Sequence, residues 1–174
     1  MDKWREIKMG RFIIESDFMY EGYRCITTFT KGGFRCGYVG VPKESKLYGK
    51  DCSDCLDVKF EDIDDRKVDK VGIIPLLMAA LNESEYVPLD VYFNVHWSLT
   101  FAGDNHPVKD SELWWLGFDC GHAEDGIDTK KVEEIWGEEI NPPYFDWEVR
   151  SLEYVQQECK NLVDQIIEYE TERR

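Results

Sequence analysis

"DFMYEGYRCITTFTKGGFRCGYVGVP", residues 17–42, is the stretch that decides the fold of this chain. On both sides of Lys31-Gly32-Gly33, aromatic and β-branched residues alternate with polar ones. A period of two is typical of strands, and a short connection containing glycine between two such runs is typical of a hairpin. The stretch therefore predicts two antiparallel strands, one on each side of the glycine turn.

A second pair of strands is predicted toward the C-terminus, over "LDVYFNVHWSLTFAG" (residues 89–103) and "LWWLGFDCGH" (residues 113–122). In the first of these, five apolar side chains fall on one face: Val91, Phe93, Val95, Trp97 and Leu99. His96 then lies on the opposite, more polar face, because strand side chains alternate in direction. The residues between the two runs have the length of a hairpin loop, so we expect antiparallel pairing.

Helices are predicted in three places. Residues 68–82 suggest a short helix that begins near Pro75, and residues 125–136 suggest another, capped by Asp128 or Thr129. The C-terminal stretch from residue 147 has apolar side chains at helical spacing: Leu152, Val155, Cys159, Leu162, Val163, Ile166 and Ile167. Such a stripe favours packing on the sheet, with a dimer seam as the alternative.

The combined pattern predicts an α+β fold. We expect an antiparallel sheet of about four to six strands, with the long amphipathic C-terminal helix packed on it. The length of 174 residues fits a single domain, residues 1–174. No parallel β-α-β rhythm and no phosphate-binding glycine loop is visible in the sequence.

The composition is acidic, with a formal net charge of −15 at pH 7. That charge repels phosphate backbones, so direct nucleic-acid binding is disfavoured. Residues 51–65 alone carry seven carboxylates against one lysine. No apolar run approaches the roughly 18 residues that a membrane span needs. We therefore expect a cytoplasmic protein with reduced cysteines and no membrane association.

The six cysteines leave two interpretations open. Cys52 and Cys55 form a C-x-x-C pair, and Cys25 and Cys36 complete a four-sulfur metal site only if the hairpin brings both sulfurs to that pair. The alternative is a set of free, half-buried thiols.

All three histidines lie between residues 96 and 122. Antiparallel pairing brings His96 toward Asp119, His122 and Asp125, which stand at and just after the end of the second strand, whereas His106 lies in the loop between the strands. Two imidazoles with carboxylates suit zinc, manganese or iron, and a histidine beside a carboxylate equally suits proton transfer. A nucleophilic thiolate at Cys120 is a third option.

Aromatic side chains near these histidines suggest a ligand pocket. The candidate walls are Tyr38, Tyr48, Trp97, Trp114 and Trp115, and serine, threonine, histidine and aspartate side chains would orient a ligand. Because neighbours on a strand face opposite sides, only one of the adjacent tryptophans at 114 and 115 can line the core, and the other is covered by a helix or faces a ligand or partner. The alternative is that both faces of the sheet are covered and both tryptophans are core residues.

Three blocks, "GYVGVPKESKLYGKDC", "VHWSLTFAG" and "WWLGFDCGHAED", together resemble a phage and prophage protein family of unassigned activity. Its members carry GYVGVP…LYGKD, VHGGLT[FY] and WW-x-GFDC-x-H-x-x-D in this order. The matching positions are Gly37, Tyr38, Gly40, Pro42, Leu47, Tyr48, Gly49, Lys50, His96, Leu99, Thr100, Gly103, Trp114, Trp115, Gly117, Phe118, Asp119, Cys120, His122 and Asp125. Trp97 and Ser98 stand where the family has two glycines. The resemblance implies phage origin and a setting in the host cytoplasm, and it implies no reaction.

Three functional hypotheses follow. The first is a phage accessory protein of the counter-defence type that binds a small polar ligand, including a nucleotide. His96 and His122 would contact polar or phosphate groups, and Asp119 would orient a histidine. The further binding residues would be Tyr38, Tyr48, Lys50, Thr100, Trp114, Trp115 and Asp125.

The second hypothesis is a hydrolase, with or without a metal, that uses His96, Asp119, His122 and Asp125. The third is an acidic inhibitor, similar to some anti-CRISPR proteins, that occupies the basic groove of a host nuclease through the run Asp51–Asp65. In that case the histidines are structural, and charge reversal of Asp57, Glu61, Asp62 and Asp64 is the test. The expected partner is accordingly a small polar ligand or a basic host protein surface. Cofactor, metal and the choice between monomer and homodimer stay open.

Overall fold

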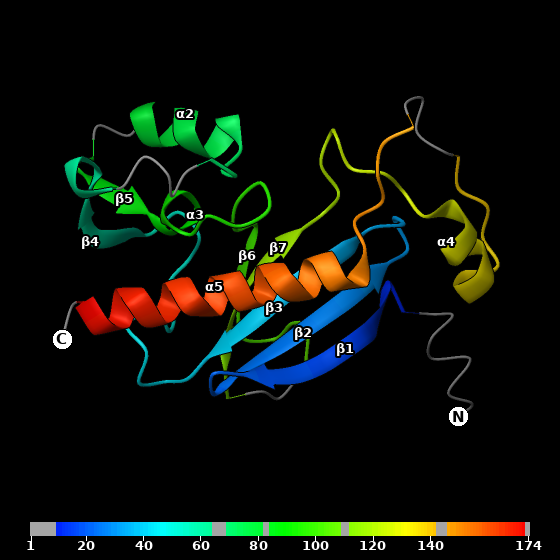
Figure 1. The fold of residues 1–174 in the computed structure, drawn as a ribbon, viewed down its shortest axis with the longest axis horizontal. Helices are drawn as coiled ribbons and strands as arrows, with labels where there is room; N and C mark the ends of the chain where they lie inside the picture. The colour runs from blue at the N-terminus through cyan, green and yellow to red at the C-terminus, as the bar shows by residue number, and fades with distance from the viewer. Residues whose placement is uncertain (1–9, 64–68, 82–83, 109–111, 142–145, 173–174) are drawn as a thin grey trace.

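A computed structural model of the chain describes residues 10–63, 69–81, 84–108, 112–141 and 146–172. Five antiparallel strands form the main sheet in the order β1-β2-β3-β7-β6, and β4 pairs with β5 in a separate two-stranded sheet. The long helix α5, Leu152–Glu172, lies across one face of the main sheet (Figure 1). The predicted α+β fold, with its antiparallel sheet and C-terminal helix, is confirmed.

The other elements have the following bounds. The main sheet contains β1 (Phe12–Tyr20), β2 (Tyr23–Thr30), β3 (Arg35–Val41), β6 (Phe101–Gly103) and β7 (Trp114–Asp119). The smaller sheet contains β4 (Cys55–Lys59) and β5 (Tyr86–Pro88). The short helices are η1 (Phe60–Asp62), α2 (Ile73–Leu81), α3 (Leu89–Tyr92) and α4 (Thr129–Trp136). Figure 1 shows α2, α3, β4 and β5 gathered at one end of the molecule.

The predicted glycine hairpin is present as β2 and β3, with Thr28 opposite Cys36. The N-terminal arm of that prediction was wrong in one respect, because it breaks into two strands at Glu21 and Gly22. These two residues have φ values of 47° and 84°, the left-handed conformation that a two-residue turn between antiparallel strands requires. The chain thereby gains β1 at the edge of the sheet.

The predicted long strand over residues 89–103 is also wrong. The segment begins as the single helical turn α3, continues without regular structure, and becomes a strand only at β6. Trp97 and Ser98 have φ values of 59° and 133°, which interrupt an extended chain. Val91, Phe93 and Val95 are nevertheless fully buried, so their alternation reflects burial rather than strand structure. The short β6 does pair antiparallel with β7, as expected.

The apolar stripe of α5 packs on the sheet as predicted. Its fully buried members are Val155, Cys159, Leu162, Val163 and Ile166. They share one core with side chains from the main sheet and the smaller sheet, including Cys25, Val39, Leu116, Phe118, Leu56 and Val58. This single core fixes the start of α5 relative to residues 93–100, where the candidate site lies.

The opposite face of the main sheet has its own clusters. Trp115 packs there with Ile26 and Tyr38, whereas Trp114 packs on the α5 side, so the adjacent tryptophans face opposite sides as predicted. Helix α4 covers Phe29, which alternation along β2 places on the same side of the sheet as Cys25 and α5. It begins at Asp128, whose carboxylate accepts a hydrogen bond from the backbone N–H of Lys131 at 3.0 Å. Within the described residues, no helix has both the length and the apolar character that crossing a bilayer requires.

Candidate functional site

The candidate site is organised around the carboxylate of Asp125, which is 4% exposed. Oδ2 of Asp125 lies 2.9 Å from Nε2 of His96, and Oδ1 accepts a hydrogen bond from Nε of Arg150 at 2.9 Å. The backbone N–H of His122 donates to Oδ2 at 3.1 Å. One buried carboxylate therefore joins three segments of the chain: the irregular run after α3, the turn after β7 and the approach to α5.

Gly126 is the reason that Arg150 reaches this carboxylate. A Cβ atom at residue 126 would collide with the backbone of residues 147–149, and the Gly126 N–H donates to the carbonyl of Glu148 at 2.9 Å. The segment before α5 thus runs directly against the turn that carries Asp125. From the sheet, the guanidinium of Arg35 donates to the carbonyl oxygen of Arg150 at 2.7 Å and holds it in place.

The ionisation of Asp125 follows from its partners. Burial would raise the pKa of this carboxyl, but its interactions with His122, His96 and Arg150 outweigh burial and hold the pKa below its usual range. The group is therefore an anion that only accepts hydrogen bonds. It follows that Nε2 of His96 carries a proton.

His96 links Asp125 to a tyrosine. Its ring is buried, and Nδ1 lies 2.9 Å from the hydroxyl of Tyr154 in the first turn of α5. Burial, with a contribution from Glu158, raises the pKa of Tyr154 to about 12, so the hydroxyl is protonated at neutral pH and can donate to Nδ1. The result is a carboxylate–imidazole–hydroxyl chain from Asp125 through His96 to Tyr154.

His122 lies beside this chain and stacks on Trp97, with ring centroids 5.2 Å apart and planes 10° from parallel. Its Nδ1 is 3.6 Å from Oδ2 of Asp125 and 3.8 Å from Oδ1 of Asp119. The interaction with Asp125 raises the pKa of His122, burial opposes this, and Asp119 adds to the increase. Nδ1 is buried and makes no hydrogen bond, so these contacts become ion pairs at longer range when the ring is protonated.

The backbone at Trp97 and Ser98 is strained because both φ values lie in the region that favours glycine. This conformation turns the chain so that His96 meets Asp125 while Trp97 meets His122. Strain of this kind costs on the order of 1–3 kcal/mol per residue and persists only where surrounding contacts enforce it. Here the contacts of His96 and Trp97 do so.

A pocket of about 400 Å³ opens next to the chain of hydrogen bonds. Its lining is Asp69, Lys70, Val71, Gly72, Ile73, His96, Trp97, Glu124, Arg150 and Tyr154. One wall, residues 69–73, is held against the irregular run after α3. The Lys70 N–H donates to the side chain of Asn94 at 2.8 Å, and the Gly72 N–H donates to the Trp97 carbonyl at 2.7 Å.

The structure brings together three of the residues predicted from the sequence, His96, His122 and Asp125, whose ligand-type atoms lie within 4.8 Å of one another. Asp119 is at the edge of this group. Its carboxylate accepts from the hydroxyl of Thr100 at 2.8 Å and from the Gly121 N–H at 3.0 Å.

The other predicted binding residues lie elsewhere. Tyr38 and Trp115 belong to the far face of the sheet, where the hydroxyl of Tyr38 is 2.8 Å from Nε2 of His106. Trp114 packs against Tyr48 and donates to the carbonyl of Lys50 at 2.9 Å. At roughly 3.3 Å per residue, this end of β7 lies on the order of 15 Å from Asp119.

Sequence reasoning missed Lys70, Arg150 and Tyr154. Tyr154 sits between two members of the apolar stripe of α5, and its aromatic character was the available signal. Lys70 and Arg150 follow no motif. Their place at the site depends on tertiary contacts, namely the Lys70 pairing with Glu158 at 2.7 Å and the backbone approach at Gly126.

The metal hypotheses can be compared with this geometry. Within the described part of the chain, His96, His122 and Asp125 form the one group of at least three metal-ligand side chains that converge. Their types suit zinc, but the Arg150 guanidinium already contacts the same carboxylate and would repel a divalent cation. Cys25 and Cys36 lie in clusters on opposite faces of the sheet, so their sulfurs cannot meet at one metal ion. The hypothesis of a four-sulfur metal site is therefore wrong.

Cys120 is poorly suited to act as a nucleophile. The thiol is 1% exposed, and burial, reinforced by Asp125, raises its pKa well above the ordinary value. A thiolate is the reactive form of cysteine, and this environment disfavours it.

Comparison of the chain with protein-family models, with curated proteins and with solved structures gave no match.

Protonation of His122 is expected to stabilise the fold. Because its pKa is raised above the ordinary 6.5, this contribution is fully present below pH 6.5 and is lost as the pH rises through the folded-state value. Urea denaturation at pH 5.5 and pH 8 should show a fall in unfolding free energy that is absent in His122→Gln. His106→Gln is the matched control and should retain the fall, and an unchanged fall in His122→Gln would contradict this assignment.

Replacing Ser98 with glycine should stabilise the protein. The substitution relieves the positive φ of 133° and should raise the unfolding free energy by about 1 kcal/mol. Ser53→Gly is the control, because residue 53 is exposed and has no positive φ, so glycine should be neutral or destabilising there. Thermal and urea denaturation measure both. A loss of stability in Ser98→Gly larger than that in Ser53→Gly would show that residue 98 is unstrained.

Proposed function

We propose that the protein binds a small polar anion, of which nucleotides are the leading class, in the pocket beside His96. The observation that carries this proposal is the position of the Asp125–His96–Tyr154 chain, which ends in the pocket wall next to Arg150. The Tyr154 oxygen, whose proton is donated to His96, can accept a hydrogen bond from an N–H or O–H of the ligand, while the Arg150 guanidinium donates to its anionic group.

The pocket is less negative than the protein as a whole. The protein has a formal net charge of −15, whereas the lining combines the cations Lys70 and Arg150 with the carboxylates Asp69 and Glu124. The donors of Arg150 are the part of this lining that favours an anionic group. Arg150 uses Nε for Asp125 and Nη1 for Glu148, and a guanidinium carries five N–H donors. It can therefore hold Asp125 and still donate to a carboxylate or phosphate.

The size of the pocket supports a ligand of modest dimensions. A volume of about 400 Å³ falls within the range of 300–1,000 Å³ that is typical of small-molecule sites. Trp97 lines the pocket, although His122 covers one face of its ring. Of the five aromatic walls suggested by the sequence, Trp97 is the one that lines this pocket.

The biological setting is part of the proposal and rests on the resemblance to phage proteins. A phage protein that sequesters a nucleotide signal inside its host cell would act in counter-defence. The φ values at Trp97 and Ser98 give a physical reason for the glycine pair that those proteins carry at these positions.

Hydrolysis of the bound ligand is the second candidate. The order carboxylate, imidazole, hydroxyl favours it, because Nδ1 of His96 can take the Tyr154 proton while the Tyr154 oxygen takes a proton from an attacking water. The same transfers in reverse then deliver a proton to the leaving-group oxygen. The net reaction adds one water to the ligand. Metal assistance would use His96, His122 and Asp125, and metal analysis of the purified protein tests it.

The test is calorimetric titration with a panel of cyclic nucleotides and ADP-ribose-type nucleotides. Tyr154→Phe removes one hydroxyl, and Lys70→Met combined with Glu158→Gln removes the cation without leaving a buried, unpaired carboxylate. Each variant should weaken binding about tenfold or more, the loss of one or two hydrogen bonds. Lys160→Met, on the same helix α5 but outside the pocket, should bind like the wild type.

The recovered ligand separates the two candidates. A binding protein returns the nucleotide intact after denaturation, whereas a hydrolase returns products. Absence of binding across the whole panel would overturn the nucleotide proposal.

A further inference from the structure

Helix α2 displays an apolar surface that no other part of the described structure covers. Five of its nine residues are large apolar side chains more than half exposed, which we call the α2 ridge: Ile73 (75%), Ile74 (70%), Leu77 (57%), Met78 (61%) and Leu81 (67%). Only Ala79 is buried. A helix that is apolar all round is normally enclosed, and a contiguous exposed apolar patch marks an interaction site.

A groove adjoins the ridge. Its volume is about 320 Å³, and its lining is Ser53, Pro75, Met78, Ala79, Leu81, Pro88 and Asp90. Met78 and Leu81 belong to both the ridge and the groove, so the apolar surface continues from the convex ridge into the concave groove. An apolar ridge with an adjoining groove is suited to the apolar face of an amphipathic segment.

The elements that share this end of the molecule with α2 carry exposed carboxylates (Figure 1). Exposed acidic residues of the neighbouring elements are Asp51, Asp54, Asp57, Glu61, Asp62 and Glu85. In residues 51–63, 69–81 and 84–92 the described cations are Lys59 and Lys70. Lys59 lies 3.3 Å from Glu85 and 3.9 Å from Glu61, and Lys70 lies 2.7 Å from Glu158. These carboxylates, which we call the acidic rim, make this end of the molecule negative, since the two described cations of these ranges are already paired.

We infer that the α2 ridge and its groove bind a basic amphipathic segment of another protein. The apolar face of the segment would cover the ridge, and its lysine and arginine side chains would meet the acidic rim. Charge complementarity of this kind selects a partner by its sign. The inference concerns a different surface from the nucleotide pocket and does not depend on it.

The same charges disfavour two other occupants. A second copy of the chain in a twofold dimer would place the same patch against itself, so acidic rim would face acidic rim. An anionic membrane surface would likewise be repelled. The ridge also differs from a nucleic-acid mimic, whose contacts with a basic groove need carboxylates and not apolar side chains. Asp57, Glu61 and Asp62 belong to the rim, whereas Asp64 and Asp65 lie outside the described residues.

Binding of a model peptide tests the inference. The probe is a labelled helical peptide of about 18 residues, with leucines along one face and lysines elsewhere. Fluorescence anisotropy should show binding to the wild type that weakens as salt is raised. Leu77→Ser combined with Met78→Ser should weaken binding tenfold or more. Because both side chains are exposed, the double substitution should leave the circular dichroism spectrum unchanged.

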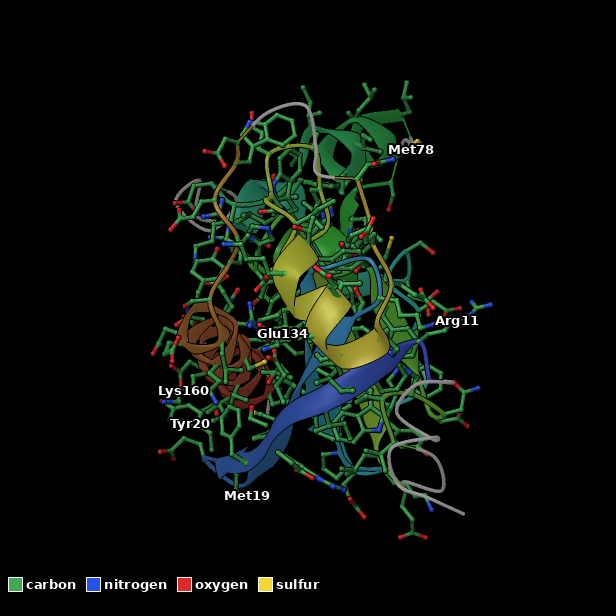
Figure 2. All side chains as sticks on the ribbon, turned by 90° about the vertical axis from the view of Figure 1, so that its right-hand side faces the viewer. Arg11, Met19, Tyr20, Met78, Glu134 and Lys160 are labelled. Carbon is green, nitrogen blue, oxygen red and sulfur yellow. The ribbon has the colours of Figure 1, made fainter. Side chains whose placement is uncertain are left out.

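Met19→Ser is the matched control. Met19 is 64% exposed, close to the 61% of Met78, and Figure 2 shows the two methionines at opposite ends of the molecule. This variant should bind like the wild type. A second control is a peptide of the same composition with scrambled order, which retains the charge and loses the apolar face.

Several outcomes would overturn the inference. Equal binding of the scrambled peptide, or unchanged binding by the Leu77→Ser, Met78→Ser variant, would show attraction by charge alone. Sedimentation that reveals a dimer abolished by the same variant would assign the ridge to a second copy. Binding to phosphatidylcholine–phosphatidylserine vesicles that the variant abolishes would assign it to a membrane.

Discussion

The site depends on how the molecule satisfies one buried charge, the carboxylate of Asp125. An ion removed from water is costly unless it is paired and hydrogen-bonded. Here His96 and Arg150 bond to its two oxygens, and the His122 N–H adds a third contact. Because these partners come from three separate segments, the charge holds those segments in one arrangement. The pocket is the space that this arrangement leaves beside α5.

The same carboxylate sets the chemistry of its neighbours. An anionic Asp125 requires a proton on Nε2 of His96, and this leaves Nδ1 to accept from Tyr154. It also raises the pKa of His122. The strained backbone at Trp97 and Ser98 is the conformational cost of bringing His96 to this point, offset by the contacts it makes possible.

The features that could be predicted from the sequence are those that local periodicity and turn chemistry determine. The β2–β3 hairpin, the buried stripe of α5 and the cap at Asp128 follow from short-range patterns, and His96, His122 and Asp125 were expected together. The prediction failed over residues 89–103. Val91, Phe93 and Val95 occupy alternate positions as in a strand, yet they belong to one helical turn and the irregular run after it, where their side chains are buried. Lys70 and Arg150 could not be found, since contacts between distant segments bring them to the site, whereas the aromatic character of Tyr154 was a signal that the sequence offered.

The most direct test of this account is the tautomer of His96, measured by nitrogen-15 NMR of the imidazole ring in the wild type and in Asp125→Asn. The account predicts a slowly exchanging proton on Nε2 and no proton on Nδ1 in the neutral ring of the wild type, with the slow exchange lost in the variant. A neutral ring protonated on Nδ1, or an Nε2 proton whose exchange does not change in Asp125→Asn, would contradict the central role of the buried carboxylate.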